Sequence, residues 1–311
     1  MVATLENLIY LTYLTNYNVG TIYYCLENAV GGSPEELAVL ASQKKSASSP
    51  TSDKNIHDVI EKAKQNTKEA IDRLTYHNIK AITFIDANYP KQLHNLNDKP
   101  PVLYLKGELP KKQELAAVVG SREVSTNAAT VTNIVVDVLS QCGFGIVSGL
   151  ALGIDTLAHE RALDCKQYTM AVMPNSLERV YPHENYKLAK RIEDSGGALV
   201  SELIFNINRG KSSFVQRNRI QSGLSSVVVP IEMGAQSGTM HTIDFAMRQK
   251  KEVILLSRTK YSKFSEGISV LIDKYSDEKY TNVHVLKNVS EFAKHIMNVS
   301  GRNIGIQARL F

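Results

Sequence analysis

Short apolar runs alternate with helical patterns along most of the chain. The runs predict strands at residues 81–85, 102–105, 115–119, 145–148, 168–173, 198–201, 226–231 and 252–256. Apolar positions at helical spacing predict helices in the intervals, at residues 126–141, 154–165, 185–195, 215–222 and 239–249. Because strands that are apolar almost throughout need cover on both faces, the pattern predicts an α/β fold with a doubly wound, mostly parallel sheet. Ligands of such sheets bind beyond the carboxyl ends of the strands.

The N-terminal part carries only helical patterns. Residues 1–42 have apolar positions at helix spacing and a capping box at Ser33–Glu36, and a longer amphipathic helix follows. The tract 41–54 is polar and rich in serine, which predicts a linker. We therefore predict a helical accessory domain at residues 1–78 and an α/β domain at residues 79–311.

Two segments lie outside the alternating pattern. At the C-terminal end, a run at residues 283–286 and a helix near 291–297 could add an edge strand or a dimer contact. In the N-terminal part, five tyrosines could stack on bases, but small helical cores use tyrosine in the same way, and the core interpretation is favoured. They are Tyr10, Tyr13, Tyr17, Tyr23 and Tyr24.

Composition narrows the range of functions. The 311 residues carry a formal net charge of +5 and a pI near 8.9, which permits a polyanionic partner without requiring one. The three cysteines make an odd count without metal-type spacing, which favours a reduced compartment. The sequence has no signal-peptide pattern and no apolar run of membrane-spanning length, so we expect a cytoplasmic protein without membrane contact.

The turn after residues 145–148 is rich in glycine and opens a helix. Gly149 and Gly153 allow close backbone approach, and the first helical turn attracts anions. The spacing differs from the nicotinamide fingerprint, and Asp155 would compete for the positive helix end. We predict a shaped, anion-accepting pocket. Asp155 and His159 lie four residues apart and could form an acid–base pair, but an aspartate holding a structural histidine is favoured.

Two further turns follow predicted strands. Gly120, Ser121 and Arg122 combine a backbone N–H, a hydroxyl and a forked cation, which suits phosphate contact as well as it suits a plain structural turn. The segment 232–239 carries more hydroxyls and glycines at a helix start than a cap needs, which predicts a second phosphate or sugar contact. Its candidate residues are Ser237, Gly238 and Thr239.

The segment 206–223 is basic, and no acidic residue occurs between Glu202 and Glu232. Cations around one aromatic ring, Phe214, are what a single-stranded nucleic acid site needs, because a stacked base contributes about 1–3 kcal/mol. A solvated loop with Phe214 in the core is the alternative. The cations are Arg209, Lys211, Arg217 and Arg219, with Asn218 between the last two. In a helix Arg217 and Arg219 would point roughly 200° apart, so one of them is predicted to be structural, paired with Glu202 or Glu232.

Together these residues resemble the DNA-processing protein A (DprA/Smf) family. The resemblance covers roughly residues 80–290 and keeps the order of the family's motifs. The matching segments are Tyr89-Pro90, Pro100 to Gly107, Val119 to Arg122, Ile146 to Asp155, Ala158-His159, Tyr181 to Asn185, Ser201-Glu202, Phe214 to Arg219, Gly223 to Ser225 and Glu232 to Thr239.

This resemblance implies an extended Rossmann-like fold and a non-enzymatic protein that binds single-stranded DNA. It also implies a homodimer that protects incoming strands in natural transformation and assists loading of a RecA-type recombinase, with no cofactor or metal. Carried over by position, the DNA pocket comprises Arg122, Lys211 and Phe214, with 217–219 close by. Met173-Pro174-Asn175 and Ser257-Arg258 depart from the family pattern, and no winged helix is recognised at the C-terminal end, which indicates a divergent member.

One alternative stays open from the sequence. A nucleotide-handling Rossmann relative, either a phosphoribohydrolase-like enzyme or a nucleotide-signal sensor, would favour a Pro-Gly-Gly-x-Gly-Thr run, which residues 232–239 echo only in part. The basic segment around Phe214 favours DNA, since a mononucleotide needs no rim of that extent. A protein-interaction role of the N-terminal helices is neither supported nor excluded.

Overall fold

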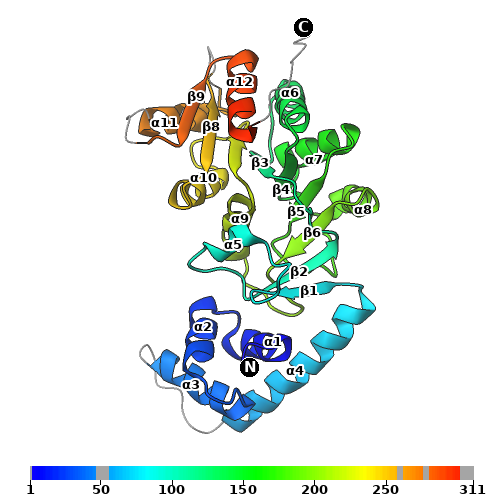
Figure 1. Cartoon of the computed structure of the whole chain (residues 1–311), viewed down its shortest axis with the longest axis vertical. Coiled ribbons are helices and arrows are strands. Elements are labelled where there is room, and N and C mark those ends of the chain that lie inside the picture. The colour runs from blue at the N-terminus through cyan, green and yellow to red at the C-terminus, as the bar shows by residue number, and fades with distance from the viewer. Residues whose placement is uncertain (1, 47–55, 258–261, 276–279, 302–311) are drawn as a thin grey trace. The chain divides into compact units, whose positions relative to one another are not determined.

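The computed structural model describes residues 2–46, 56–257, 262–275 and 280–301 (Figure 1). The chain divides into two compact units, each continuous in space but not in sequence. One unit comprises Met1–Lys106, Asn175–Arg179 and Val200–Gly210, and the other comprises Gly107–Pro174, Val180–Leu199 and Lys211–Phe311. Among the described residues no helix combines the length and the apolar character that crossing a bilayer requires.

The parallel strands belong to the second unit, except that the last two residues of β6 are counted with the first. The strand order is β6-β5-β4-β3-β7-β8-β9, and the pairs β5–β4, β4–β3, β3–β7, β7–β8 and β8–β9 are all parallel. The strands are β3 (Leu115–Val119), β4 (Gly145–Ser148), β5 (Thr169–Val172), β6 (Ala198–Ser201), β7 (Val227–Pro230), β8 (Glu252–Leu256) and β9 (Val283–Leu286). From β3 the chain builds outward through β4 and β5, then returns to add β7 on the other side of β3. The switch point of the sheet therefore lies between β3 and β7.

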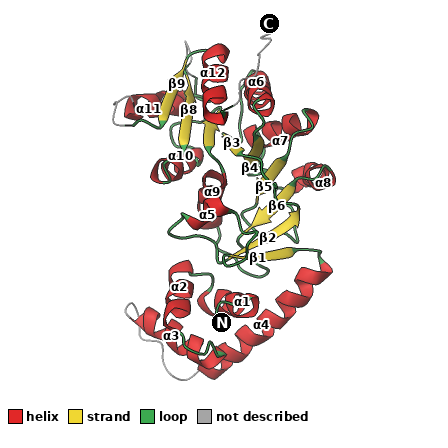
Figure 2. Ribbon diagram, in the orientation of Figure 1, coloured by secondary structure: helices red, strands yellow, loops and turns green. Residues whose placement is uncertain are grey.

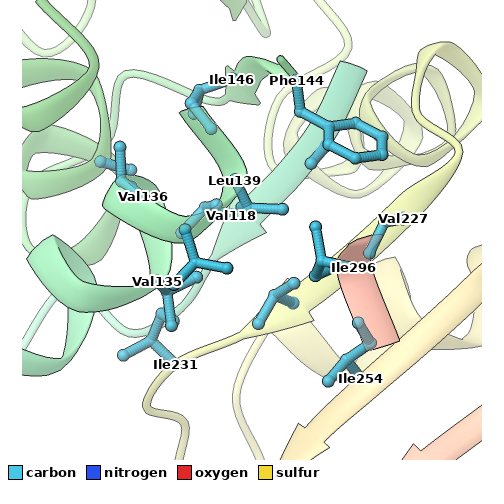
Figure 3. Close-up of a cluster of buried hydrophobic side chains, with 14 of the residues drawn as sticks. Val118, Val135, Val136, Leu139, Phe144, Ile146, Val227, Ile231, Ile254 and Ile296 are labelled. Carbon is cyan, nitrogen blue, oxygen red and sulfur yellow. The ribbon is translucent and has the colours of Figure 1, made fainter. Parts of the chain in front are cut away.

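Helices cover both faces of this sheet (Figures 1 and 2). They are α6 (Ala128–Gln141), α7 (Ile154–Asp164), α8 (Tyr186–Asp194, after a short 3-10 turn His183–Asn185), α9 (Ser212–Leu224), α10 (Thr239–Arg248), α11 (Glu266–Tyr275) and α12 (Val289–Ser300). Alternate strand residues face opposite layers: Val118 and Ile254 join a core with α6, α7 and α12, whereas Val119 and Val253 join a core with α10 and α11. Figure 3 shows the first of these cores, in which Val135 and Ile296 approach from the helices.

The first unit contains the N-terminal helices and a two-stranded antiparallel pair. Its elements are α1 (Leu5–Thr15), α2 (Val19–Asn28), α3 (Pro34–Ser46), α4 (Ile56–Tyr76), β1 (Lys80–Thr83), α5 (Lys91–His94) and β2 (Val102–Gly107), and β1 pairs with β2. Tyr10 and Tyr17 are buried, and their hydroxyls donate to the carbonyl of Pro34 and to Glu202. The core interpretation of these two tyrosines is confirmed.

The predicted fold class, an extended Rossmann-like doubly wound sheet preceded by helices, is confirmed. The run at residues 283–286 forms the edge strand β9. The tract predicted as a linker is partly helical, because α3 continues to Ser46, and its residues 47–54 lie outside the described residues. The boundary at residue 78 stays a prediction, since a compact unit is not evidence for independent folding.

Candidate nucleic-acid interface

A pocket of about 640 Å³ lies at the carboxyl ends of β3 and β7, where the switch point predicts a ligand site. The turn Gly120–Glu123 lines it from β3, and Gly234–Thr239 lines it from the segment after β7. Helix α9 contributes Phe214 and Arg217. A second pocket of about 220 Å³ shares Arg122, Phe214 and Arg217 with the first and adds Tyr181. All of these residues belong to the second unit.

The turn after β3 is held in place by Glu232. Its carboxylate is fully buried and accepts from the backbone N–H and the hydroxyl of Ser125, at 2.9 and 2.6 Å. The backbone N–H of Ser121 donates to the carbonyl of Glu232 at 2.7 Å. A β-carbon on Gly120 would lie 2.8 Å from that carbonyl and 2.4 Å from Ile154, so glycine is required here. Braced in this way, the turn presents the exposed side chain of Arg122 to the pocket.

The glycine-rich turn after β4 is filled from within the protein. The Asp155 carboxylate accepts from the backbone N–H groups of Gly149 and Ala151, at 3.1 and 3.3 Å. These N–H groups belong to the turn before α7, so the aspartate occupies donors that a phosphate at this turn would use, rather than the helix end at which competition was predicted. Gly153 has φ +80°, and a β-carbon there would lie 2.3 Å from the carbonyl oxygen of Ser121. The two glycines of this turn therefore allow close packing of the chain against itself.

Arg217 occupies the space that a side chain at position 149 would need. A β-carbon on Gly149 would lie 2.4 Å from the guanidinium nitrogens of Arg217. The guanidinium donates to the carbonyl of Gly149 at 2.7 Å and to the carbonyl of Val172. Burial lowers the pKa of Arg217 to about 10, and the charge of Asp155 opposes that shift. Burial likewise raises the pKa of the Asp155 carboxyl, and Arg217 opposes that shift in turn.

Arg217 is thus a structural arginine, although its acidic neighbour is Asp155 rather than Glu202 or Glu232. Arg219 is also buried, and one of its nitrogens donates to the carbonyl of Gln216 at 3.2 Å. Burial of both guanidinium groups gives them internal roles in this conformation.

Phe214 is the aromatic residue of the site and is only half-buried. The guanidinium carbon of Arg122 lies 5.4 Å from the centre of the Phe214 ring, and the Tyr181 ring meets it edge-on at 5.5 Å. Arg122 and Tyr181 are both exposed. A flat ring is thereby flanked by an exposed cation and by a second ring, and all three side chains line the smaller pocket.

The segment before α10 closes the other wall of the larger pocket. The Ser237 hydroxyl accepts from the backbone N–H of Thr239 at 3.3 Å and contacts the Thr239 hydroxyl at 3.2 Å. Gly238 is exposed and a β-carbon there would meet nothing within 4 Å. Asn218 reaches from α9 toward the carbonyl of Gly238 at 3.4 Å. These residues line the pocket as a polar surface.

Not every predicted site residue lines the two pockets. Lys211 is exposed and immediately precedes α9, but it lines neither of them. Gly153 and Arg219 do not line them either. Conversely, Tyr181, Lys263 and Glu266 line a pocket and were not predicted as site residues. Tyr181 belongs to the motif Tyr181–Asn185, whereas the other two lie where the sequence shows no pattern.

The predicted contact between Asp155 and His159 is wrong. His159 is fully buried and its Nδ1 lies 2.7 Å from the hydroxyl of Thr169. That hydroxyl is also bonded to the carbonyl of Ile146, so it donates there and accepts the Nδ1 proton of the ring. The Nε2 atom of His159 has no hydrogen-bond partner in the described structure, and burial lowers the pKa of the His159 ring to about 3. Asp155 turns toward the glycine loop because the N–H groups there are otherwise unsatisfied.

The fold and site define an α/β protein of Rossmann type whose switch-point pocket is lined by the ring of Phe214 and by both basic and acidic side chains. The family model of DNA recombination-mediator protein A matches residues 80–290, and the chain belongs to that family. It is 37% identical to Protein Smf of Escherichia coli (strain K12) over 185 residues, which is 59% of this chain and 50% of Smf. It is 31% identical to DNA processing protein DprA of Bacillus subtilis (strain 168) over 198 residues, 63% of this chain and 66% of that protein. The chain spans about half the length of the Smf relatives it matches.

Solved structures of DNA processing protein A share this fold. DNA processing protein A from Streptococcus pneumoniae superposes with a TM-score of 0.74 at 25% identity, over 94% of this chain and 98% of that chain. The protein from Helicobacter pylori, whose structure is described as giving insight into a unique single-stranded DNA binding mode, superposes with a TM-score of 0.61 at 27% identity. That match covers 71% of this chain and 96% of the other.

Proposed function

We propose that this chain binds single-stranded DNA at the pocket between the ends of β3 and β7. Arg122 and Lys211 neutralise phosphates, and an unpaired base stacks on Phe214 with Tyr181 beside it. The polar wall of Ser121, Asn218, Ser237, Gly238 and Thr239 contacts sugar or phosphate. Gly149, Gly153, Arg217 and Arg219 shape the site from inside.

The observation that carries this proposal is the half-buried ring of Phe214 beneath an exposed guanidinium, 5.4 Å from ring centre to guanidinium carbon. A ring wholly inside the core could not stack on a base, and a cation engaged in a buried ion pair could not reach a phosphate. Membership of the recombination-mediator family and the single-stranded DNA binding named for the Helicobacter pylori relative support single-stranded DNA as the ligand.

The biological role that fits this binding is non-enzymatic. We propose protection of single strands and assisted loading of a RecA-type recombinase during transformation or recombination, by a cytoplasmic homodimer. In support, neither His nor Cys is among the described residues that line the two pockets, and the nearby His159 is buried and neutral. Hydroxyl and carboxylate side chains line the larger pocket, but no imidazole or thiol is among its described lining residues to act as base or nucleophile.

Fluorescence anisotropy with labelled strands tests the proposal. Wild type should prefer single strands to duplex, and its affinity should fall steeply with salt because neutralised phosphates release counterions. Arg122→Ala and Lys211→Ala should each reduce the salt slope, by about 0.7 for each phosphate that the variant no longer neutralises. Phe214→Leu keeps an apolar side chain but removes the ring, so it should cost about 1–3 kcal/mol of binding with the slope nearly unchanged.

Lys294→Ala serves as a matched control, because Lys294 is exposed on α12 and lines neither pocket. It should bind like wild type. Each variant is also unfolded thermally, so that reduced affinity is separated from disrupted structure. Equal affinity for single strands and duplex, or unchanged binding by Phe214→Leu, would rule out the proposed site.

Free nucleotides are the second candidate ligand. The larger pocket, at about 640 Å³, falls within the range of small-molecule sites, and a Rossmann switch point commonly holds a nucleotide. Competition by mononucleotides in the same anisotropy assay distinguishes the two. A nucleotide site predicts displacement at low concentration of one specific nucleotide, whereas a DNA site predicts weak displacement by all of them.

A further inference from the structure

Three potential metal ligands meet at the edge of the sheet away from the DNA pocket. They are Glu252, the first residue of β8, His284 on β9 and His295 on α12. One ligand atom from each lies within 4.8 Å of the others. Glu252 stands at the amino end of its strand, whereas the DNA pocket lies at the carboxyl ends of the strands.

The fold brings these three side chains to one face. Ile254 pairs in register with His284 and belongs to the core under α12, and Glu252 lies two residues before it on the same strand face. Ile296, the neighbour of His295, packs in that same core. The three side chains therefore come together because alternate strand residues share a face and because α12 packs on that face.

Hydrogen bonding within the protein does not satisfy the cluster. Nε2 of His284 lies 2.6 Å from a carboxylate oxygen of Glu252, and Nε2 of His295 lies 3.8 Å from the same oxygen. The buried Nε2 of His295 has no hydrogen-bond partner in the described structure. The two imidazole rings are tilted by 41° with their centres 4.1 Å apart, and both Nε2 atoms lie within 4 Å of the one carboxylate oxygen. Leaving the buried Nε2 of His295 without a hydrogen bond costs free energy, and a group bound between this nitrogen and the Glu252 carboxylate would remove that cost.

We propose that Glu252, His284 and His295 bind a divalent transition-metal ion, for which Zn²⁺ is the natural representative. Two imidazoles and one carboxylate, with a position open to water, form a common zinc ligand set. In a tetrahedral zinc site the ligand atoms are about 3.3 Å apart, so changes of up to about 1.5 Å in the present separations, which all lie within 4.8 Å, would seat the ion. Mg²⁺ and Ca²⁺ prefer oxygen ligands and would bind poorly.

The ion would join α12, which is held by packing, to β8 and β9, which already pair with one another. It would tie α12 and the edge strand β9 to β8 and so stabilise an edge that has no further strand beyond it among the described residues. This inference rests on the cluster alone and is independent of DNA binding.

Zinc binding is tested on the full chain after treatment with EDTA and dialysis. ZnCl₂ is titrated in competition with a chromophoric chelator, and thermal unfolding is followed with and without the metal. We expect one Zn²⁺ per chain and a higher unfolding midpoint, with no shift from MgCl₂. The Co²⁺ derivative should show the intense d–d absorption of a tetrahedral site.

His295→Gln should reduce zinc affinity at least about 100-fold and abolish the Zn²⁺-dependent midpoint shift. His241→Gln, which removes an exposed histidine from α10, should behave as wild type. Glu252→Gln keeps both imidazoles and the side-chain size, so it provides a second test if His295→Gln folds poorly. Absence of stoichiometric zinc in wild type, or equal zinc affinity in His295→Gln and His241→Gln, would overturn the site and leave only a His–Glu hydrogen bond.

Discussion

Arg122 and Arg217 line the same pocket but differ in what surrounds their charge. Arg122 is exposed and lies near an aromatic ring, so its side chain can move to meet a phosphate at little cost. Arg217 is buried, bonded to two carbonyls and balanced by Asp155, so its charge is part of the fold. Removing one member of a buried charge pair leaves the other uncompensated, which is the expensive outcome.

We expect Arg217→Leu to lower the free energy of unfolding by about 3–5 kcal/mol, because Asp155 then lacks its positive neighbour. Arg122→Leu should change it by less than about 0.5 kcal/mol while weakening DNA binding. Urea unfolding measures the first effect and anisotropy the second. If the two variants unfolded at the same urea concentration, the internal role of Arg217 would be disproved.

The buried His159 ring should lower the free energy of unfolding in acid. Burial, and secondarily the charge of Arg217, lowers the pKa of this ring from 6.5 to about 3. Because the folded pKa is below the unfolded one, the neutral ring contributes stability that is complete above about pH 6.5 and declines as the pH falls. The expected decline is at most about 1.4 kcal/mol per pH unit.

His159→Gln should flatten this slope between about pH 6.5 and about pH 4, measured by urea unfolding at several pH values. The raised pKa of Asp155 acts in the opposite direction, since its stabilising contribution is lost as the pH rises. It is common to both proteins, so the difference in slope isolates the histidine. His241→Gln, an exposed change, is the control, and a slope in His159→Gln equal to that of wild type would contradict the argument.

At the level of elements, α12 illustrates how a helix end is specified locally. The Asn288 side chain accepts from the backbone N–H of Glu291 at 2.9 Å, and the Glu291 carboxylate accepts from the N–H of Lys287 at 2.8 Å. Asn288→Ala should therefore cost about 1 kcal/mol of unfolding free energy. Asn298→Ala, a change in the last turn of the same helix, tests whether the effect belongs to the cap. Equal losses in the two variants, measured by urea unfolding, would exclude capping as the cause.

The strands of the second unit were predictable because burial on both faces makes them short apolar runs between polar turns. The predicted bounds at 115–119, 145–148 and 252–256 agree with β3, β4 and β8. Helix α9 was predicted too short, because serine, asparagine and glycine are poor helix formers and packing against α10 and the sheet extends it. Helix α11 was missed for the same reason, since Gly267 lies in its first turn against a neighbouring carbonyl.

The candidate site was predictable only where a single segment carries it. Arg122 and Phe214 were identified because each lies in a conspicuous local pattern. Tyr181 was not, because its value depends on meeting Phe214, which lies more than thirty residues later in the chain. The Glu252–His284–His295 cluster was not predicted for the same reason: its residues are brought together by tertiary packing, and their spacing in the sequence matches no metal-binding pattern.

At the level of the whole molecule, the N-terminal helices share one compact unit with two segments from later in the chain. The Tyr13 hydroxyl donates to the carbonyl of Phe205 at 3.0 Å, and the Tyr17 hydroxyl donates to Glu202 at 2.6 Å. The guanidinium of Arg73 stacks 4.2 Å from the centre of the Phe205 ring. Phe205 is only 1% exposed within this unit, so the helices and the segment 200–210 depend on each other for burial.

A fragment that begins at residue 79 should therefore unfold at a lower urea concentration than the full chain and should aggregate more readily. In the fragment Phe205 becomes exposed to water, and the Glu202 carboxylate loses the hydrogen bond from Tyr17. Both changes lower the stability of the fragment.

Tyr17→Phe in the full chain isolates the second effect. The expected cost is about 1.5–3 kcal/mol of unfolding free energy, because the lost hydrogen bond is to a charged group. If the fragment proved as stable and soluble as the full chain, residue 78 would be a true domain boundary and the contacts of Tyr13, Tyr17 and Arg73 would be dispensable. A less stable fragment would mean that the N-terminal helices are needed to fold the segment 200–210. This segment is followed directly in the sequence by Lys211 and α9, which carry residues of the proposed DNA site.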